Sequence, residues 1–162
     1  MNGRIEVKPD DRIYLDTNVF VEAFEHEGEL SSLVASLLAA NSQQRPQRLV
    51  TSELTLAELL VRPLELNQTA LVQTYDNWMT TNPYLEVYPV VRSILRQAAE
   101  FRAHDKTLKL PDAIHLTTSI ETNCRYFLTN DRRIAGQFGV EILAMTEDNV
   151  RILLMGQPDG PI

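Results

Sequence analysis

Four acidic residues of the 162-residue chain occupy positions at which carboxylates could act together as ligands. Asp16 and Asp131 each follow a short apolar run that is typical of a buried strand. Glu58 and Asp112 each lie in the first turns of an expected helix. Ligands of open α/β sheets bind at the carboxyl ends of the strands, and in a parallel sheet these ends share one edge. We therefore expect the four carboxylates to converge there.

Mutual repulsion among these carboxylates is the reason to expect a cation. Two carboxylates about 5 Å apart repel by roughly 3 kcal/mol at an effective dielectric near 20. Four of them form six such pairs, so without a cation some would have to protonate or move apart. Mg²⁺ or Mn²⁺ suits a site made of carboxylate oxygens. Such a metal centre is suited to phosphoester hydrolysis, because the metal activates a water and stabilises the attacking and leaving oxygens.

Each acid also has a purely structural interpretation. Asp16 could cap the helix that follows it. Glu58 could close a capping box with Thr55, since "TLAE" fits the pattern S/T-x-x-E. Asp112 could favour a helix dipole, and Asp131 could stabilise a turn. Taken singly, each acid fits the structural role better, whereas the four together favour the metal site.

The elements that must position these acids alternate along the chain. Strands are expected over residues 12–16, 48–51, 85–88, 125–129 and 140–143. Helices are expected over residues 19–24, 29–43, 52–62, 67–81, 89–106, 111–123 and 146–155. Pro63 should end the third helix, Pro89 should lie in the first turn of the fifth, and Thr146 should cap the last.

Strands separated by helices predict an α/β fold, here a three-layer α/β/α sandwich with a mostly parallel central sheet of about five strands. Without a repeat or a linker, residues 1–162 are expected to form a single domain. The single cysteine, Cys124, excludes an internal disulfide, and the first twelve residues lack the apolar run of a secretion signal. We expect a cytoplasmic protein with no membrane partner.

The net charge of −7 argues mildly against binding nucleic acid through unspecific phosphate contacts. A few cations can still surround one site in an acidic protein. Arg132 and Arg133 follow Asp131 directly, so they could contact RNA phosphates or could equally begin an exposed helix. His115 lies three residues after Asp112 on the same expected helix, and we expect it to be a hydrogen-bonded structural residue.

The segments "IYLDTNVFVEAF", "TSELTLAELL" and "LKLPDAIHLTTSIETNCRYFLTNDRRI" together resemble the PIN-domain family. They are similar in particular to its VapC-type toxins of bacterial toxin–antitoxin pairs. The order of D-T-N, a helical Glu, L-P-D-A-I-H and T-N-D carries this resemblance. The likeness covers about residues 12–145, and residues 146–162 add an expected helix and tail beyond it.

The resemblance implies a ribonuclease that depends on one or two Mg²⁺ or Mn²⁺ ions. Asp16, Glu58, Asp112 and Asp131 match the acidic quartet of the family, which is catalytic and holds the metal. Asp16 and Asp112 would be central ligands, and Glu58 would bind metal or position the water. Asn18 and Thr129 match polar positions that support this site.

The same resemblance implies an RNA substrate, an antitoxin protein as partner and a homodimer. Two other functions fit the sequence less well. A non-catalytic PIN-like module that binds RNA or protein is the alternative, but an intact quartet argues against it. An aspartyl-phosphate mechanism is a poor fit, because Asn18 stands where the general acid would be needed.

Overall fold

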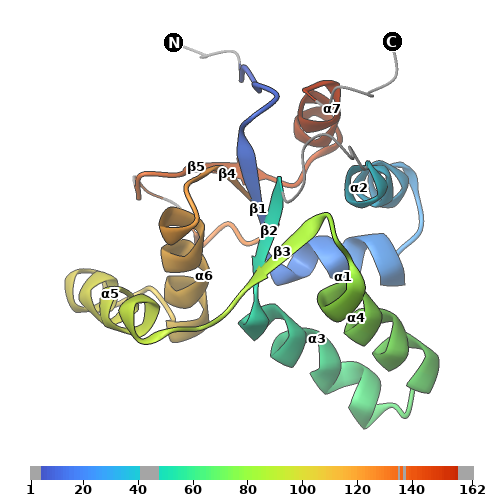
Figure 1. Cartoon of the computed structure of the whole chain (residues 1–162), viewed down its shortest axis with the longest axis horizontal. Coiled ribbons are helices and arrows are strands. Elements are labelled where there is room, and N and C mark those ends of the chain that lie inside the picture. The colour runs from blue at the N-terminus through green and yellow to red at the C-terminus, as the bar shows by residue number, and fades with distance from the viewer. Residues whose placement is uncertain (1–4, 41–47, 135, 137, 157–162) are drawn as a thin grey trace.

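The centre of the computed structural model, which describes residues 5–40, 48–134, 136 and 138–156, is a sheet of five strands (Figure 1). The strands are β1 (Arg12–Leu15), β2 (Leu49–Ser52), β3 (Leu85–Tyr88), β4 (Cys124–Thr129) and β5 (Glu141–Ala144). All neighbouring strands are parallel, in the order β3-β2-β1-β4-β5. The expected sheet is therefore confirmed, and it is parallel throughout.

Helices cover both faces of this sheet. They are α1 (Thr17–Glu25), α2 (Glu29–Ala39), α3 (Glu53–Glu65), α4 (Thr69–Thr81), α5 (Arg92–His104), α6 (Leu110–Glu121) and α7 (Glu147–Met155). Figure 1 shows α5 and α6 on one side and α1, α2, α4 and α7 on the other. These three layers confirm the expected α/β/α sandwich.

Strand β1 contributes to two separate hydrophobic cores, because successive side chains of a strand point to opposite faces. Ile13 and Leu15 pack in the core formed with α1, α2, α4 and α7, whereas Tyr14 packs in the core with α5 and α6. All three side chains are fully buried. The end of β1 is therefore anchored on both sides.

The strand order reverses at β1, whose neighbours β2 and β4 lie on opposite sides of it. In open α/β sheets, the crevice at such a switch point is where ligands bind. Leu15 of β1 pairs with Leu128 of β4, and the backbone N–H of Asp16 donates to the Leu128 carbonyl over 3.1 Å. The fold thus brings Asp16 next to Thr129 at this switch point.

Two expectations about proline were wrong. Pro63 does not end α3, which continues to Glu65 with Pro63 buried inside its last turn. A proline there removes only one backbone hydrogen bond near the end of the helix, and its ring packs in the interior. Pro89 does not lie in α5 either, because Val91 is extended and caps a helix that begins at Arg92.

Other boundaries differ by a few residues. The first helix begins at Thr17, two residues earlier than expected, because Asp16 caps it. The second ends at Ala39, and residues 41–43 of its expected span lie outside the described residues, as do 157–162 of the expected tail. Thr146 caps α7 as expected. Within the described part of the chain, no helix combines the length and the apolar character needed to cross a membrane.

Replacing Leu128 by alanine should lower the free energy of unfolding by about 2–5 kcal/mol, because it leaves a cavity at a fully buried position of β4. Urea denaturation followed by circular dichroism measures the change. Leu64→Ala on α3 is the matched control, since Leu64 is 57% exposed and should change stability by less than about 0.5 kcal/mol. Equal losses in both variants would contradict the central place of β4.

Candidate active site

Asp16 is held in place through both of its carboxylate oxygens. Its Oδ1 accepts a hydrogen bond from the backbone N–H of Thr17 over 2.8 Å, which confirms that Asp16 caps α1. Its Oδ2 accepts from the hydroxyl of Thr129 over 2.6 Å. Asp16 is only 6% exposed. A buried charge requires such donors, so the capping role and a place in the site coincide in one residue.

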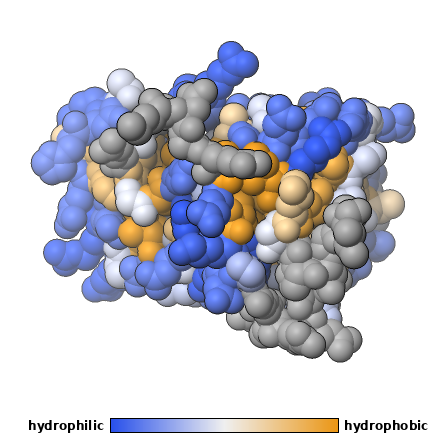
Figure 2. Space-filling view, turned by 90° about the horizontal axis from the view of Figure 1, so that it is seen from above, coloured by the Kyte–Doolittle hydropathy of each residue, from blue (hydrophilic) through white to orange (hydrophobic). Residues whose placement is uncertain are grey.

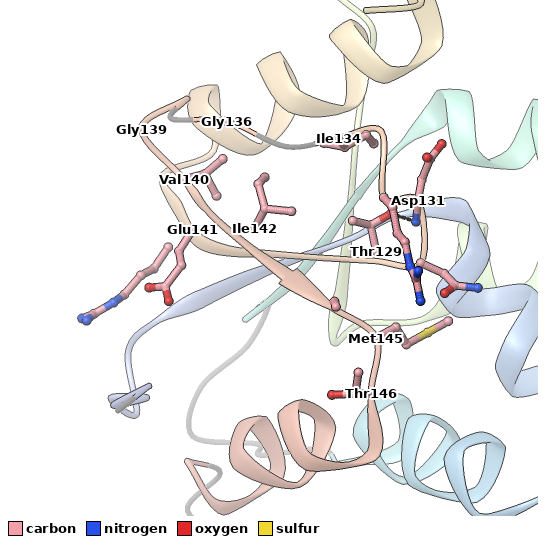
Figure 3. Close-up of a pocket in the computed structure, with 14 residues that line it drawn as sticks. Thr129, Asp131, Ile134, Gly136, Gly139, Val140, Glu141, Ile142, Met145 and Thr146 are labelled. Carbon is pink, nitrogen blue, oxygen red and sulfur yellow. Dashed lines mark hydrogen bonds between the residues drawn. The ribbon is translucent and has the colours of Figure 1, made fainter. Parts of the chain in front are cut away.

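Thr129 connects Asp16 to the next acid along the edge. While its hydroxyl donates to Asp16, the same oxygen accepts the backbone N–H of Asp131 over 2.9 Å. Figure 3 shows Thr129 and Asp131 joined in this way. The supporting position expected for Thr129 therefore has a defined contact, made at the end of β4.

Glu58 does not close a capping box with Thr55, and that expectation was wrong. The helix α3 begins earlier, with Ser52 as its cap, and the Thr55 hydroxyl bonds to Thr51 over 2.7 Å. Glu58 reaches toward the switch point instead. Its Oε2 accepts hydrogen bonds from the Thr17 hydroxyl and from Nε2 of His115, the latter over 2.8 Å.

Two residues that sequence reasoning missed as members of the site are thus Thr17 and His115. His115 is hydrogen-bonded and buried as expected, but its partner is Glu58, and its Nε2 lies 3.9 Å from Oδ1 of Asp16. Its spacing of three residues from Asp112 was the available signal. Asn18 is exposed, and its supporting role remains a prediction.

The pKa of Glu58 lies below its ordinary value. Burial opposes its ionisation, but the hydrogen bonds from His115 and Thr17 outweigh that effect. Glu58 therefore remains a carboxylate at neutral pH. An ionised Glu58 beside Asp16 is the state that a metal ligand requires.

Asp112 lies half-buried in the first turn of α6. Its pKa is raised, first by burial and then by the nearby carboxylates of Asp131 and Asp16. Within the described residues, no group donates a hydrogen bond to its carboxylate. Of the four acids, Asp112 alone lacks a hydrogen-bond donor among the described residues, although the nearby charge of Arg133 partly offsets the rise of its pKa.

Asp131 has the opposite environment, because Arg133 neutralises it. Its Oδ1 accepts the backbone N–H and the Nε–H of Arg133, each over 2.9 Å. This contact lowers the pKa of Asp131.

Asp131 and Arg132 also line a cavity of about 880 Å³ that extends along β5, where Val140 and Ile142 form part of the wall (Figure 3).

The four acids of the expected quartet thus share the region around the ends of β1 and β4. Across the described ranges, no three His, Cys, Asp or Glu side chains are placed so that together they could hold a metal ion. The chemistry of the donors nevertheless fits a hard divalent cation, because the carboxylates of Asp16, Glu58 and Asp112 supply only oxygen. Such a cation would also neutralise the charge of Asp112, which accepts no hydrogen bond from the described residues.

These features define a three-layer α/β/α domain with an acidic site at the switch point of a parallel sheet. The family model of the PIN domain matches residues 13–136. The chain therefore belongs to the PIN domain family, as its motifs indicated. Among curated proteins, no sequence matches this chain.

Several solved structures share the fold. A toxin–antitoxin complex from Klebsiella pneumoniae is 21% identical, with a TM-score of 0.61 over 83% of this chain and 98% of that one. FitAcB from Neisseria gonorrhoeae is 18% identical, with a TM-score of 0.62 over 82% and 97%. VapC20 from Mycobacterium tuberculosis, described as a sarcin–ricin loop cleaving toxin, is 16% identical, with a TM-score of 0.59 over 78% and 92%.

Thr129→Val should lower the free energy of unfolding by about 1.5–3 kcal/mol, since it removes the hydroxyl that donates to the buried carboxylate of Asp16. Chemical denaturation measures this loss. Thr81→Val is the matched control, because the exposed Thr81 hydroxyl binds only a carbonyl of its own helix. That variant should stay within about 0.5 kcal/mol of the wild type. A similar result for Thr129→Val would show that Asp16 does not depend on this contact.

Proposed function

We propose that this PIN domain is an endoribonuclease that depends on Mg²⁺ or Mn²⁺. The observation that carries the proposal is that Asp16 and Asp112, at the switch point, have contrasting environments. Asp16 is fixed through both oxygens, whereas the nearby Asp112 has a raised pKa and no donor among the described residues. A fixed carboxylate beside one that lacks a hydrogen-bond donor is an arrangement that a divalent cation would stabilise.

Asp16, Glu58 and Asp112 would hold the cation, and Asp131 would join them or act at their border. When bound, the cation supplies positive charge for the scissile phosphate and lowers the pKa of a water molecule. Thr129 and Thr17 keep Asp16 in one orientation. Glu58, ionised and fixed through Oε2, would orient the attacking water with Oε1. Hydrolysis of the phosphodiester would release a 3′-hydroxyl.

RNA is the substrate that the comparisons support, since VapC20 is described as cleaving the sarcin–ricin loop. The best placed cations for its phosphates are Arg132 and Arg133, which follow Asp131 at the end of β4. Arg132 lines the cavity beside β5, and the side chain of Arg133 is 61% exposed although it pairs with Asp131. Both positions allow contacts with a backbone that approaches the acidic site.

We propose further that the protein is the toxin of a toxin–antitoxin pair, held inactive by an antitoxin. The solved complexes from Klebsiella pneumoniae and Rickettsia felis, the second 20% identical with a TM-score of 0.60, support this role. Exposed apolar residues such as Val61, Leu64 and Leu66 at the end of α3 suit contacts with a protein partner. Figure 2, which views the molecule from above and so from the side away from α3, shows further hydrophobic residues open to the surface among hydrophilic ones. The homodimer remains a prediction.

Purified protein with Mn²⁺ should cleave a mixed RNA pool, and EDTA should abolish the cleavage. Asp16→Asn should reduce the rate more than about 100-fold, because it weakens a central ligand. Asp76→Asn on α4 is the control and should retain activity, since Asp76 is exposed outside the site. Gel analysis of the products measures the rates. No cleavage with several metals would favour a non-catalytic module that binds RNA or protein.

Expression of the protein alone should slow bacterial growth, and Asp16→Asn should relieve that effect. The reason is that the proposed toxicity requires hydrolysis of RNA. Growth curves measure the growth defect, and Asp76→Asn, the control variant, should slow growth as much as the wild type does. Equal toxicity of Asp16→Asn and the wild type would contradict the mechanism.

Mn²⁺ should stabilise the folded protein because it binds only the assembled carboxylates. At a free concentration 100 times its Kd, the gain is about 2.7 kcal/mol. A thermal melt with and without Mn²⁺ measures the shift, and Asp112→Asn should remove most of it. Asp76→Asn should retain the full shift. An unchanged shift in Asp112→Asn would place the metal elsewhere.

A further inference from the structure

A line of hydrogen bonds runs from the interior of the sheet to Glu58. The hydroxyl of Tyr14 lies 2.7 Å from Nδ1 of His115, and Nε2 of the same ring lies 2.8 Å from Oε2 of Glu58. Tyr14 is fully buried and His115 is 1% exposed. The three residues come from β1, α6 and α3, so the line joins distant parts of the chain.

The direction of these hydrogen bonds follows from the chemistry of the groups. A carboxylate only accepts, so Nε2 of His115 must carry a hydrogen and donate it to Glu58. In the neutral ring Nδ1 then accepts from the Tyr14 hydroxyl. Burial, followed by the charge of Asp16, raises the pKa of Tyr14 well above its ordinary value, so the phenol keeps the proton that it donates.

The ring of Tyr14 is held in place by packing, so it fixes the inner end of this line of hydrogen bonds. It stacks on Phe127 of β4 with ring centres 4.9 Å apart. Both aromatic side chains are fully buried. The Tyr14 and His115 rings form a T-shaped pair with ring centres 5.9 Å apart. His115 therefore has a fixed neighbour that limits rotation of its ring.

The consequence for Glu58 is that its two oxygens differ. Oε2 receives the hydrogen bonds of His115 and Thr17, whereas no described residue donates to Oε1. The donors thus occupy one oxygen and leave the other available. Without these two hydrogen bonds, the side chain of Glu58 could adopt several rotamers.

We propose that His115 is a positioning residue of the site, which holds Glu58 through Oε2 so that Oε1 is presented to the cation or the attacking water, with Tyr14 fixing the ring. This inference rests on the proposed nuclease function. It goes beyond the acidic quartet, because it assigns the orientation of one acid to an imidazole and a phenol of the core.

A matched pair of variants distinguishes the role of Nε2 of His115 from the role of Nδ1. His115→Gln places an amide N–H near the position of Nε2 and retains a donor for Glu58. His115→Asn places its amide near Nδ1, so it can reach Tyr14 but not Glu58. We expect His115→Asn to lower kcat about 10–100-fold with little change in KM for RNA, and His115→Gln to stay within about threefold of the wild type.

Mn²⁺ affinity gives a readout that does not depend on turnover. Calorimetric titration of the intact protein with Mn²⁺ should show Kd raised about tenfold in His115→Asn and only about threefold in His115→Gln, which keeps the donor to Glu58 but loses the contact with Tyr14. Nitrogen-15 NMR of the wild-type imidazole should show a protonated Nε2. Equal Mn²⁺ affinities for the two folded variants would overturn the proposal, as would a wild-type ring with a bare Nε2.

Tyr14→Phe keeps the inference testable if substitutions of the buried His115 prevent folding. It removes only the hydroxyl and keeps the stack on Phe127. We expect it to change the nitrogen-15 shift of Nδ1 and to weaken Mn²⁺ binding several-fold. If both signals stay at their wild-type values, Tyr14 does not fix the ring and that part of the proposal fails.

The two proposals can fail separately. If the wild type cleaves no RNA but binds Mn²⁺ with the expected order of affinities among the variants, the nuclease function fails and the positioning role stands. If the wild type cleaves RNA and both His115 variants cleave it equally well, the nuclease function stands and the positioning role fails.

Discussion

The burial of the Asp16 carboxylate is the constraint around which the rest of this structure is arranged. A buried charge is tolerated only where donors surround it, and the fold supplies them from two directions. The start of α1 provides a backbone N–H, and the end of β4 provides the Thr129 hydroxyl. The first donor is local, but the second depends on the parallel pairing of β1 with β4, so the environment of the charge depends on the order of the strands.

The remaining acids differ in how the protein treats their charge. Asp131 is paired with Arg133, and Glu58 is held by His115 and Thr17. Asp112 accepts no hydrogen bond from the described residues, and burial and the neighbouring acids raise its pKa although the charge of Arg133 opposes them. Four acids that look equivalent in the sequence thus occupy distinct environments. A bound cation would therefore change the environment of Asp112 more than that of Asp131, whose charge Arg133 already neutralises.

Much of this fold could be predicted because its causes are local. Alternation of apolar runs and amphipathic segments revealed the strands and the helices, and the acids at their junctions indicated the edge where they meet. The wrong expectations concerned Pro63, Pro89 and the Thr55–Glu58 capping box, where local rules were overridden by packing or by an earlier helix start. The contact between His115 and Glu58 could not be derived, since it joins residues 57 positions apart through the packing of α3 against α6.

The distance along the chain between Asp16 and its donor Thr129 has a consequence for biosynthesis. These partners are 113 residues apart, and β4 must pair with β1 before the Thr129 hydroxyl can bind Asp16. A ribosome synthesises β1 well before β4, and domains generally fold as units. A nascent or truncated chain that lacks β4 therefore carries Asp16 without the Thr129 hydroxyl that holds it. For a proposed nuclease that would act on cellular RNA, this order of assembly delays activity until β4 has been synthesised.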